Sequence, residues 1–115
     1  MARDEEITVR TERRGKTTIV WPEGDIDLGR SPTLRESLRK AASDRPGRLV
    51  IDLSLVEYMD SSGVATLVEA LQLSRKNSTV LVLCGMKDKV RSIFEIARLD
   101  TVFTIATSLD VAVQG

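Results

Sequence analysis

The chain has 115 residues, of which 42% are hydrophobic and 30% charged, a composition typical of one soluble globular domain over residues 1–115. Lysine plus arginine number 17 and aspartate plus glutamate also number 17, so no basic surplus indicates nucleic-acid binding. Histidine is absent, which excludes Ser-His-Asp and Cys-His catalysis, histidine-bound zinc and phosphohistidine chemistry.

The cysteine content and the first residues bear on the cellular compartment. Cys84 is the single cysteine and cannot form an internal disulfide or a CxxC redox pair, which fits a reducing compartment. The first six residues lack the apolar core of a signal peptide, and no window approaches the roughly 18 apolar residues of a membrane span. We expect a cytoplasmic protein with no direct membrane insertion, no cofactor and no metal.

The first half of the chain predicts a hairpin and a helix after a polar lead-in over residues 1–4. Gly15 supplies the permissive backbone of a turn, and the β-branched residues after it favour a strand. Ser31 followed by Pro32 is typical of a helix start, with the serine hydroxyl as the cap. The expected elements are a weak strand over 6–10, a turn over 13–16, a strand over 17–21, an acidic turn over 22–27 and a helix from Ser31 that stops before Pro46.

Strands and helices alternate in the second half. Residues 49–53 are nearly all apolar, as expected of a strand buried on both faces. The spacing of a helical apolar stripe occurs at Val64, Leu67, Val68 and Leu71, and again at Val90, Ile93, Phe94 and Ala97. The expected elements are strands over 49–53, 79–84 and 101–105 and helices over 64–76, 88–97 and 109–113.

The resulting element order is β-β-α-β-α-β-α-β-α. A hairpin followed by alternating strands and helices predicts an α/β domain with a mixed, mostly parallel sheet of four to five strands and about four helices. Cys84 and Trp21 end apolar strands, so both are expected to pack in or beside the core.

The run Asp60-Ser61-Ser62-Gly63 lies between the strand over 49–53 and the following helix. A hydroxyl at a helix start can cap free N–H groups, act as a nucleophile or accept a phosphate. The nucleophile is disfavoured because the chain has no histidine base, no G-x-S-x-G elbow and no S-x-x-K arrangement at these serines. Capping and phosphate acceptance both stay open, and Gly63 is expected to let another surface approach closely.

Acidic residues are predicted to gather near these serines. Asp25 and Asp27 follow the second strand and Asp60 follows the third, so neighbouring strands would place all three at one sheet edge. They can be solvated loop acids or part of a binding surface. If Ser61 is phosphorylated, about −1.5 to −2 charges are added beside them, which would repel a partner that binds the neutral serine surface.

Several segments together resemble one known family. The run Glu57-Tyr58-Met59-Asp60-Ser61-Ser62-Gly63-Val64 is similar to the phosphorylation loop of bacterial anti-sigma factor antagonists, which are STAS domains. The similarity extends to the segments 24–27, 34–38, 49–53 and 90–99 and so covers most of the chain. It implies a single STAS-like domain with a regulatory role and no enzymatic activity.

The resemblance implies a partner switch. The unphosphorylated domain would bind an anti-sigma factor of the GHKL serine-kinase type and so release a sigma factor, and a PP2C-type phosphatase would reverse phosphorylation. The acceptor carried over is Ser61, with Ser62 less favoured. The implied partner-binding residues are Asp25, Asp27, Asp60, Ser61, Ser62, Gly63 and Val64.

Other members of the family leave alternatives open. The chain could instead be the STAS subunit of a lipid-transport ABC complex or another STAS scaffold, although its Asp-Ser-Ser-Gly run favours the phosphorylation switch. A monomer or a weak dimer is expected.

Overall fold

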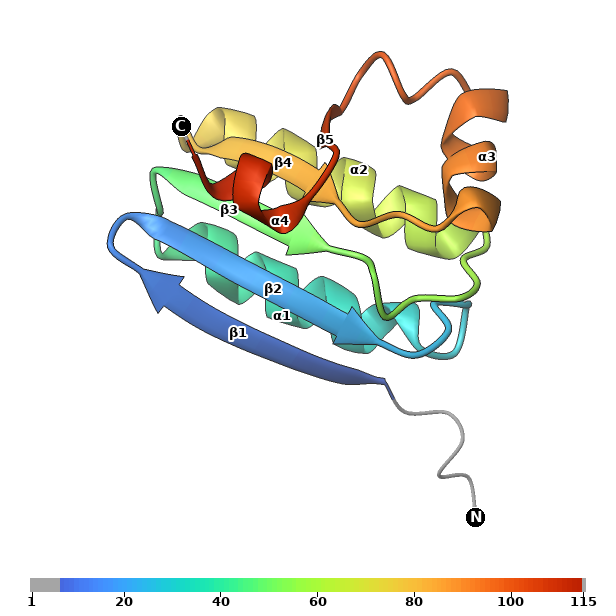
Figure 1. Ribbon diagram of the computed structural model, residues 1–115. Coiled ribbons are helices and arrows are strands. Elements are labelled where there is room, and N and C mark those ends of the chain that lie inside the picture. Colours follow the sequence, from blue (N-terminus) through green and yellow to red (C-terminus); the bar gives the residue numbers. More distant parts are fainter. Residues whose placement is uncertain (1–6, 115) are drawn as a thin grey trace.

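A mixed β-sheet organises the molecule, and its strands lie in chain order (Figure 1). The computed structural model describes residues 7–114. β1 (Thr8–Arg14) pairs antiparallel with β2 (Thr17–Glu23), and the remaining neighbours pair parallel. The sheet is completed by β3 (Arg48–Asp52), β4 (Val80–Cys84) and β5 (Thr104–Ala106). The predicted α/β class and element order are confirmed.

The helices divide unequally between the two faces of the sheet. α1 (Ser31–Ser43) and α2 (Ser61–Lys76) lie side by side on one face, and α4 (Leu109–Val113) lies on the other (Figure 1). α3 (Asp88–Ile96) stands at the end of the sheet to which the parallel strands point. Because right-handed crossovers that step in one direction place their helices on one face, the strand order itself puts α1 and α2 together.

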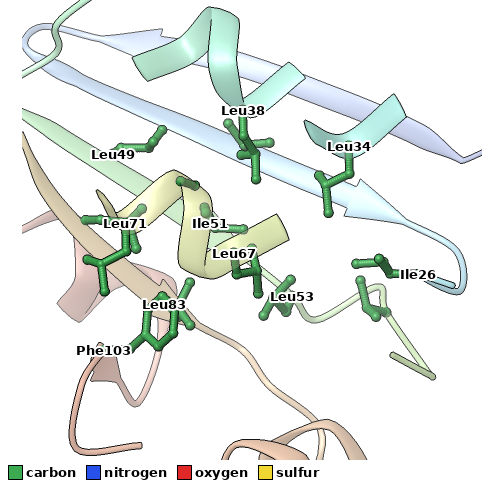
Figure 2. Close-up of a cluster of buried hydrophobic side chains, with 14 of the residues drawn as sticks. Ile26, Leu34, Leu38, Leu49, Ile51, Leu53, Leu67, Leu71, Leu83 and Phe103 are labelled. Carbon is green, nitrogen blue, oxygen red and sulfur yellow. The ribbon is translucent and has the colours of Figure 1, made fainter. Parts of the chain in front are cut away.

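β2, β3 and β4 are largely buried on both faces, and their successive side chains alternate between the faces. Leu49 and Ile51 belong to the larger core cluster, shown in Figure 2 with Leu34, Leu38 and Leu67 of the two long helices. Val50, between them, belongs to a smaller cluster on the opposite face. That second cluster joins the sheet to α4 through Ile19, Trp21, Val50, Val82, Cys84 and Ala112. The predicted burial of Trp21 and Cys84 is confirmed.

The hairpin is longer and its turn tighter than the sequence predicts. β1 runs to Arg14, so Arg13 and Arg14 are strand residues and the turn consists of Gly15, with φ of 62°, and Lys16. β2 extends through Pro22, which lies beyond Val20, the last β2 residue paired with β3. A proline is tolerated there because no neighbour requires its missing N–H. Residues 1–4 and Glu6 lie outside the described range.

The end of α3 and both ends of the last strand also differ from the predicted bounds. α3 ends at Ile96, and Ala97, expected on its apolar stripe, is exposed. Arg98 then adopts a φ of 60°, which a helix cannot continue. The last strand covers 104–106 instead of 101–105, because residues 101–102 form a turn.

The start of α1 differs in its chemistry. Ser31 is the first helical residue and is buried, and no side chain occupies the capping role at the preceding Arg30. Asp27 serves this end instead. Its carbonyl oxygen accepts the Ser31 N–H at 2.8 Å and its Oδ1 atom accepts the Arg30 N–H at 3.1 Å. The predicted Ser31 hydroxyl cap is therefore wrong.

Candidate functional site

Two loops meet at the carboxyl ends of β2 and β3. They are joined by a parallel bridge between Ile26 and Met59. The Ile26 N–H donates to the Tyr58 carbonyl at 2.9 Å, and the Asp60 N–H donates to the Ile26 carbonyl at 3.0 Å. This bridge places the Asp25–Asp27 segment beside the start of α2, so the structure brings the predicted acids and serines to one edge.

Asp60 is the cap of α2. Its Oδ1 atom accepts the N–H groups of Ser62 at 2.9 Å and Gly63 at 3.3 Å, and the Ser62 Oγ donates to it at 2.5 Å. The Leu28 backbone also contributes to favouring the charged form of this carboxylate. The Ser62 hydroxyl, followed by these backbone donors, holds the pKa of Asp60 below its ordinary value, because each hydrogen bond favours the charged form.

Ser61 is therefore not needed as a cap. It is the first residue of α2, which begins three residues earlier than the predicted Val64 because Asp60 caps the added turn. The Ser61 side chain is exposed, and within residues 7–114 its Oγ atom has no hydrogen-bond partner. Of the two serines, Ser62 is half-buried and bound to Asp60, whereas Ser61 presents a free hydroxyl to solvent.

Gly63 and Val64 contribute less exposed surface than expected. Gly63 is buried, and a Cβ atom there would lie 2.5 Å from the Met59 Cγ and 2.7 Å from the Ile26 Cγ2. The surface that approaches Gly63 closely is thus the protein's own pair of loops, which corrects the expectation that a partner does so. Val64 is half-buried and packs against the main core.

The two other predicted acids differ from each other. Asp25 is exposed and makes no hydrogen bond or ion pair within the described chain. Asp27 is half-buried, and its Oδ2 atom pairs with the Arg30 guanidinium at 2.7 Å. Asp25 therefore adds an uncompensated negative charge to this edge, whereas Asp27 mainly fixes the first turn of α1.

Two exposed apolar residues at this edge were not predicted from the sequence. Leu28 is 77% exposed and Tyr58 is 51% exposed, whereas their neighbours Ile26 and Met59 are buried. The available signal was the placement of large apolar residues inside polar loop sequence. The ion pair between Glu57 and Lys87, whose charged atoms lie 2.5 Å apart, was also not predicted; it connects this loop to the start of α3.

Two other features, a metal site and a membrane-spanning helix, were sought in the part of the chain that the structure describes. No group of three histidine, cysteine, aspartate or glutamate side chains is placed to hold a metal ion between residues 7 and 114. Over the same residues, none of the helices combines the length and the apolar content that a membrane crossing requires.

The fold and this site define a known class of small α/β domain. The sequence model of the STAS domain family matches residues 8–112, so the chain belongs to this family. An anti-sigma-B factor antagonist of Listeria monocytogenes is 34% identical over 100 residues, which are 86% of this chain and 88% of that protein.

Solved structures agree with this family. An anti-sigma factor antagonist from Mycobacterium paratuberculosis superposes with a TM-score of 0.87 at 27% identity, over 97% of this chain and 95% of the other. The anti-sigma factor antagonist SpoIIAA in its unphosphorylated form gives a TM-score of 0.70 at 14% identity, over 90% and 92% of the two chains. Its phosphorylated form also gives 0.70, at 17% identity over 90% and 96%, and these two likenesses concern the fold alone.

Proposed function

We propose that this protein is an anti-sigma factor antagonist that is switched by phosphorylation of Ser61. The observation that carries the proposal is the exposed, unbonded Ser61 hydroxyl at the start of α2, beside an Asp60 that already caps the helix. The names of the relatives support the antagonist role. In its unmodified form the domain binds an anti-sigma factor and so releases a sigma factor in the cytoplasm.

The proposed modification is an ordinary phosphoryl transfer. The anti-sigma factor, a serine kinase of the GHKL type, transfers the γ-phosphoryl group of ATP to the Ser61 Oγ, which loses its proton as ADP leaves. A PP2C-type phosphatase hydrolyses the phosphoserine and returns the free hydroxyl and inorganic phosphate. Ser62 is the less suitable acceptor because its hydroxyl is already bound to Asp60.

The charge of this edge explains why phosphorylation would release the partner. The phosphate adds about −1.5 to −2 charges next to the ionised Asp60 and near the exposed Asp25. A neutral hydroxyl that keeps a hydrogen-bond partner costs little to bury at an interface, whereas a charged phosphate costs far more unless cations meet it. A loss of only about 2.7 kcal/mol lowers affinity roughly 100-fold.

The position at a helix start explains why the fold can tolerate the same phosphate. The first N–H groups of a helix and its macrodipole favour negative charge, so the modified side chain lies in a favourable local field. The proposal therefore predicts a change of surface charge without unfolding of the domain.

The test measures binding to each purified GHKL-type kinase of the source organism, with wild type, Ser61→Ala and Ser61→Asp. Ser61→Ala should bind like wild type, and Ser61→Asp should bind roughly 100-fold more weakly. Ser78→Asp is the matched control, because Ser78 is exposed and follows the opposite end of α2. Equal affinity of all four proteins for the kinase that wild type binds would overturn the switch.

Mass spectrometry after treatment with that kinase and ATP identifies the acceptor. Phosphate is expected on Ser61, and phosphate only on Ser62 would refute the assignment. If wild type binds none of these kinases but copurifies stoichiometrically with a transport ATPase, the antagonist function is replaced by that of a transporter subunit.

A further inference from the structure

Leu28 and Tyr58 are exposed apolar residues, one on each of the two bridged loops at the start of α2, and are here called the apolar pair. On the basis of the proposed function, we propose that these two side chains are the main apolar contacts of this protein with its partner, here called the anchors. They would insert into an apolar pocket of the anti-sigma factor when Ser61 is unmodified. Neither residue is among the partner-binding residues that the sequence predicts.

Backbone contacts place the segment that carries Leu28 beside the start of α2. The Ile26–Met59 bridge aligns the two loops, and two residues further along each loop lie Leu28 and Ser61. The loops are still adjacent just after the bridge, because the Asp60 N–H donates to the Ile26 carbonyl at 3.0 Å. Tyr58 lies on the other side of the same bridge, where its carbonyl accepts the Ile26 N–H.

The same loops hold the pair in place. Ile26 is 0% and Met59 is 1% exposed, and both pack in the main core. Each loop thus has one buried residue that fixes the backbone carrying its exposed apolar side chain. Anchors held in this way lose little freedom on binding, which is the condition under which apolar contact contributes most to affinity.

Single exposed apolar residues are common, so exposure alone would carry no inference. Here two of them lie on hydrogen-bonded loops at the same edge as a free hydroxyl and a helix cap. Tyrosine is among the residues that dominate binding energy at interfaces, where it fills a pocket with its ring and keeps its hydroxyl near the rim.

The charge around the apolar pair indicates which kind of partner binds there. Asp25 and Asp60 carry negative charges next to the apolar pair, and Asp60 is kept ionised by its lowered pKa. A second copy docked on the same patch would bring like charges together, which disfavours self-association. The patch instead fits a different protein whose apolar pocket has a cationic rim.

The arrangement also explains why a phosphate on Ser61 would be so effective. Burial of Leu28 in a partner pocket removes water from the neighbouring Ser61 hydroxyl, which a neutral side chain tolerates. A phosphate at the same place would have to be desolvated for Leu28 to enter. Phosphorylation and burial of this anchor are therefore mutually exclusive.

The test measures the dissociation constant of the kinase complex for wild type, Leu28→Ser and Tyr58→Ala. Truncating each anchor should weaken binding roughly 10- to 100-fold, the effect of failing to bury one large apolar side chain. Tyr58→Phe should retain most of the affinity because it keeps the ring. Val111→Ser is the control, since Val111 is 51% exposed but lies on α4, across the sheet. Circular dichroism checks that each variant is folded.

The outcomes separate this proposal from the switch itself. If Ser61→Asp abolishes binding while Leu28→Ser and Tyr58→Ala bind like wild type, the anchors are refuted and the switch stands. If wild type binds no GHKL-type kinase, the switch proposal and the anchor proposal are both refuted. If Leu28→Ser keeps full kinase affinity but dissociates a dimer in sedimentation equilibrium, the patch is a self-association surface and the anchor proposal is overturned.

Discussion

The Ser62 Oγ donates a 2.5 Å hydrogen bond to the Oδ1 atom of Asp60, two residues earlier. The same oxygen accepts the backbone N–H groups of Ser62 and Gly63, so one carboxylate satisfies the start of α2. The two adjacent serines therefore have different roles. Ser62 belongs to the cap, and Ser61 keeps a hydroxyl that no other described residue engages.

Replacing Asp60 by alanine should destabilise the protein. The substitution leaves the N–H groups of Ser62 and Gly63 without their acceptor, and loss of a helix cap costs about 1 kcal/mol, within a range of about 0.5–2. Urea unfolding followed by circular dichroism measures the change. Asp25→Ala is the control because Asp25 is exposed and unbonded in the described chain, so its effect should stay within about 0.5 kcal/mol.

The stability contributed by the Asp60 charge should depend on pH. The pKa of Asp60 is lowered in the folded state, chiefly by the Ser62 hydroxyl, below the unfolded value of about 3.9. The stabilisation is therefore present above about pH 4 and is lost as the pH falls through the folded-state pKa. Wild type should exceed Asp60→Asn in unfolding free energy at pH 7, and the excess should shrink as the pH falls below about 4. A pH-independent difference would contradict this assignment.

Most of the fold could be predicted because each strand or helix is indicated by a pattern of apolar residues within its own segment. Continuous apolar runs marked β3 and β4, and the apolar spacing of α2 marked its buried side, where Leu67 and Leu71 indeed lie. Chain order and the handedness of crossovers then fixed the layers. The division of the core into two faces, with only the five-residue α4 over the second, depends on packing between distant elements and could not be read from the sequence.

That the acids and serines lie at one edge could be predicted, but the exposed Leu28 and Tyr58 and the role of each residue could not. Asp25, Asp60 and Ser61 could be placed at one edge from strand order alone. Which oxygen caps α2 depends on backbone geometry that any of three adjacent residues could supply, and the structure assigns it to Asp60. The role of Gly63 depends on Ile26, which is distant in the sequence and adjacent in space.

Replacing Gly63 by alanine should be destabilising although alanine favours helices. Its Cβ would lie 2.5 Å from the Met59 Cγ and 2.7 Å from the Ile26 Cγ2, both in a closely packed interior. Overpacking of this kind costs about 1–3 kcal/mol, and denaturant unfolding measures it. Gly47→Ala is matched, because its nearest neighbour would lie at an ordinary 3.5 Å. Equal stability of the two variants would show that the loops yield readily at Gly63.

The Cys84 thiol should be inert in the folded protein. It is buried at the end of β4, and burial, aided by the negative charge of Asp52, raises its pKa to about 12. At pH 8 only about one thiol in 10⁴ is then ionised, and thiol reagents require the thiolate. Ellman's reagent should react slowly under native conditions and rapidly in urea. Rapid native labelling would show that the second core opens readily.

Negative charge should be tolerated at Ser61 and not at Ser62. At Ser61 the attraction of the helix start opposes repulsion by Asp60, so Ser61→Asp should change the free energy of unfolding by less than about 1 kcal/mol. Ser62→Asp replaces the donor of the 2.5 Å bond to Asp60 with a second carboxylate, which should cost more, about 1–3 kcal/mol. Parallel urea unfolding of both variants makes the comparison, and the phosphorylated protein should follow Ser61→Asp. A larger loss at Ser61 than at Ser62 would mean that the modification acts by loosening α2, not by charging its surface.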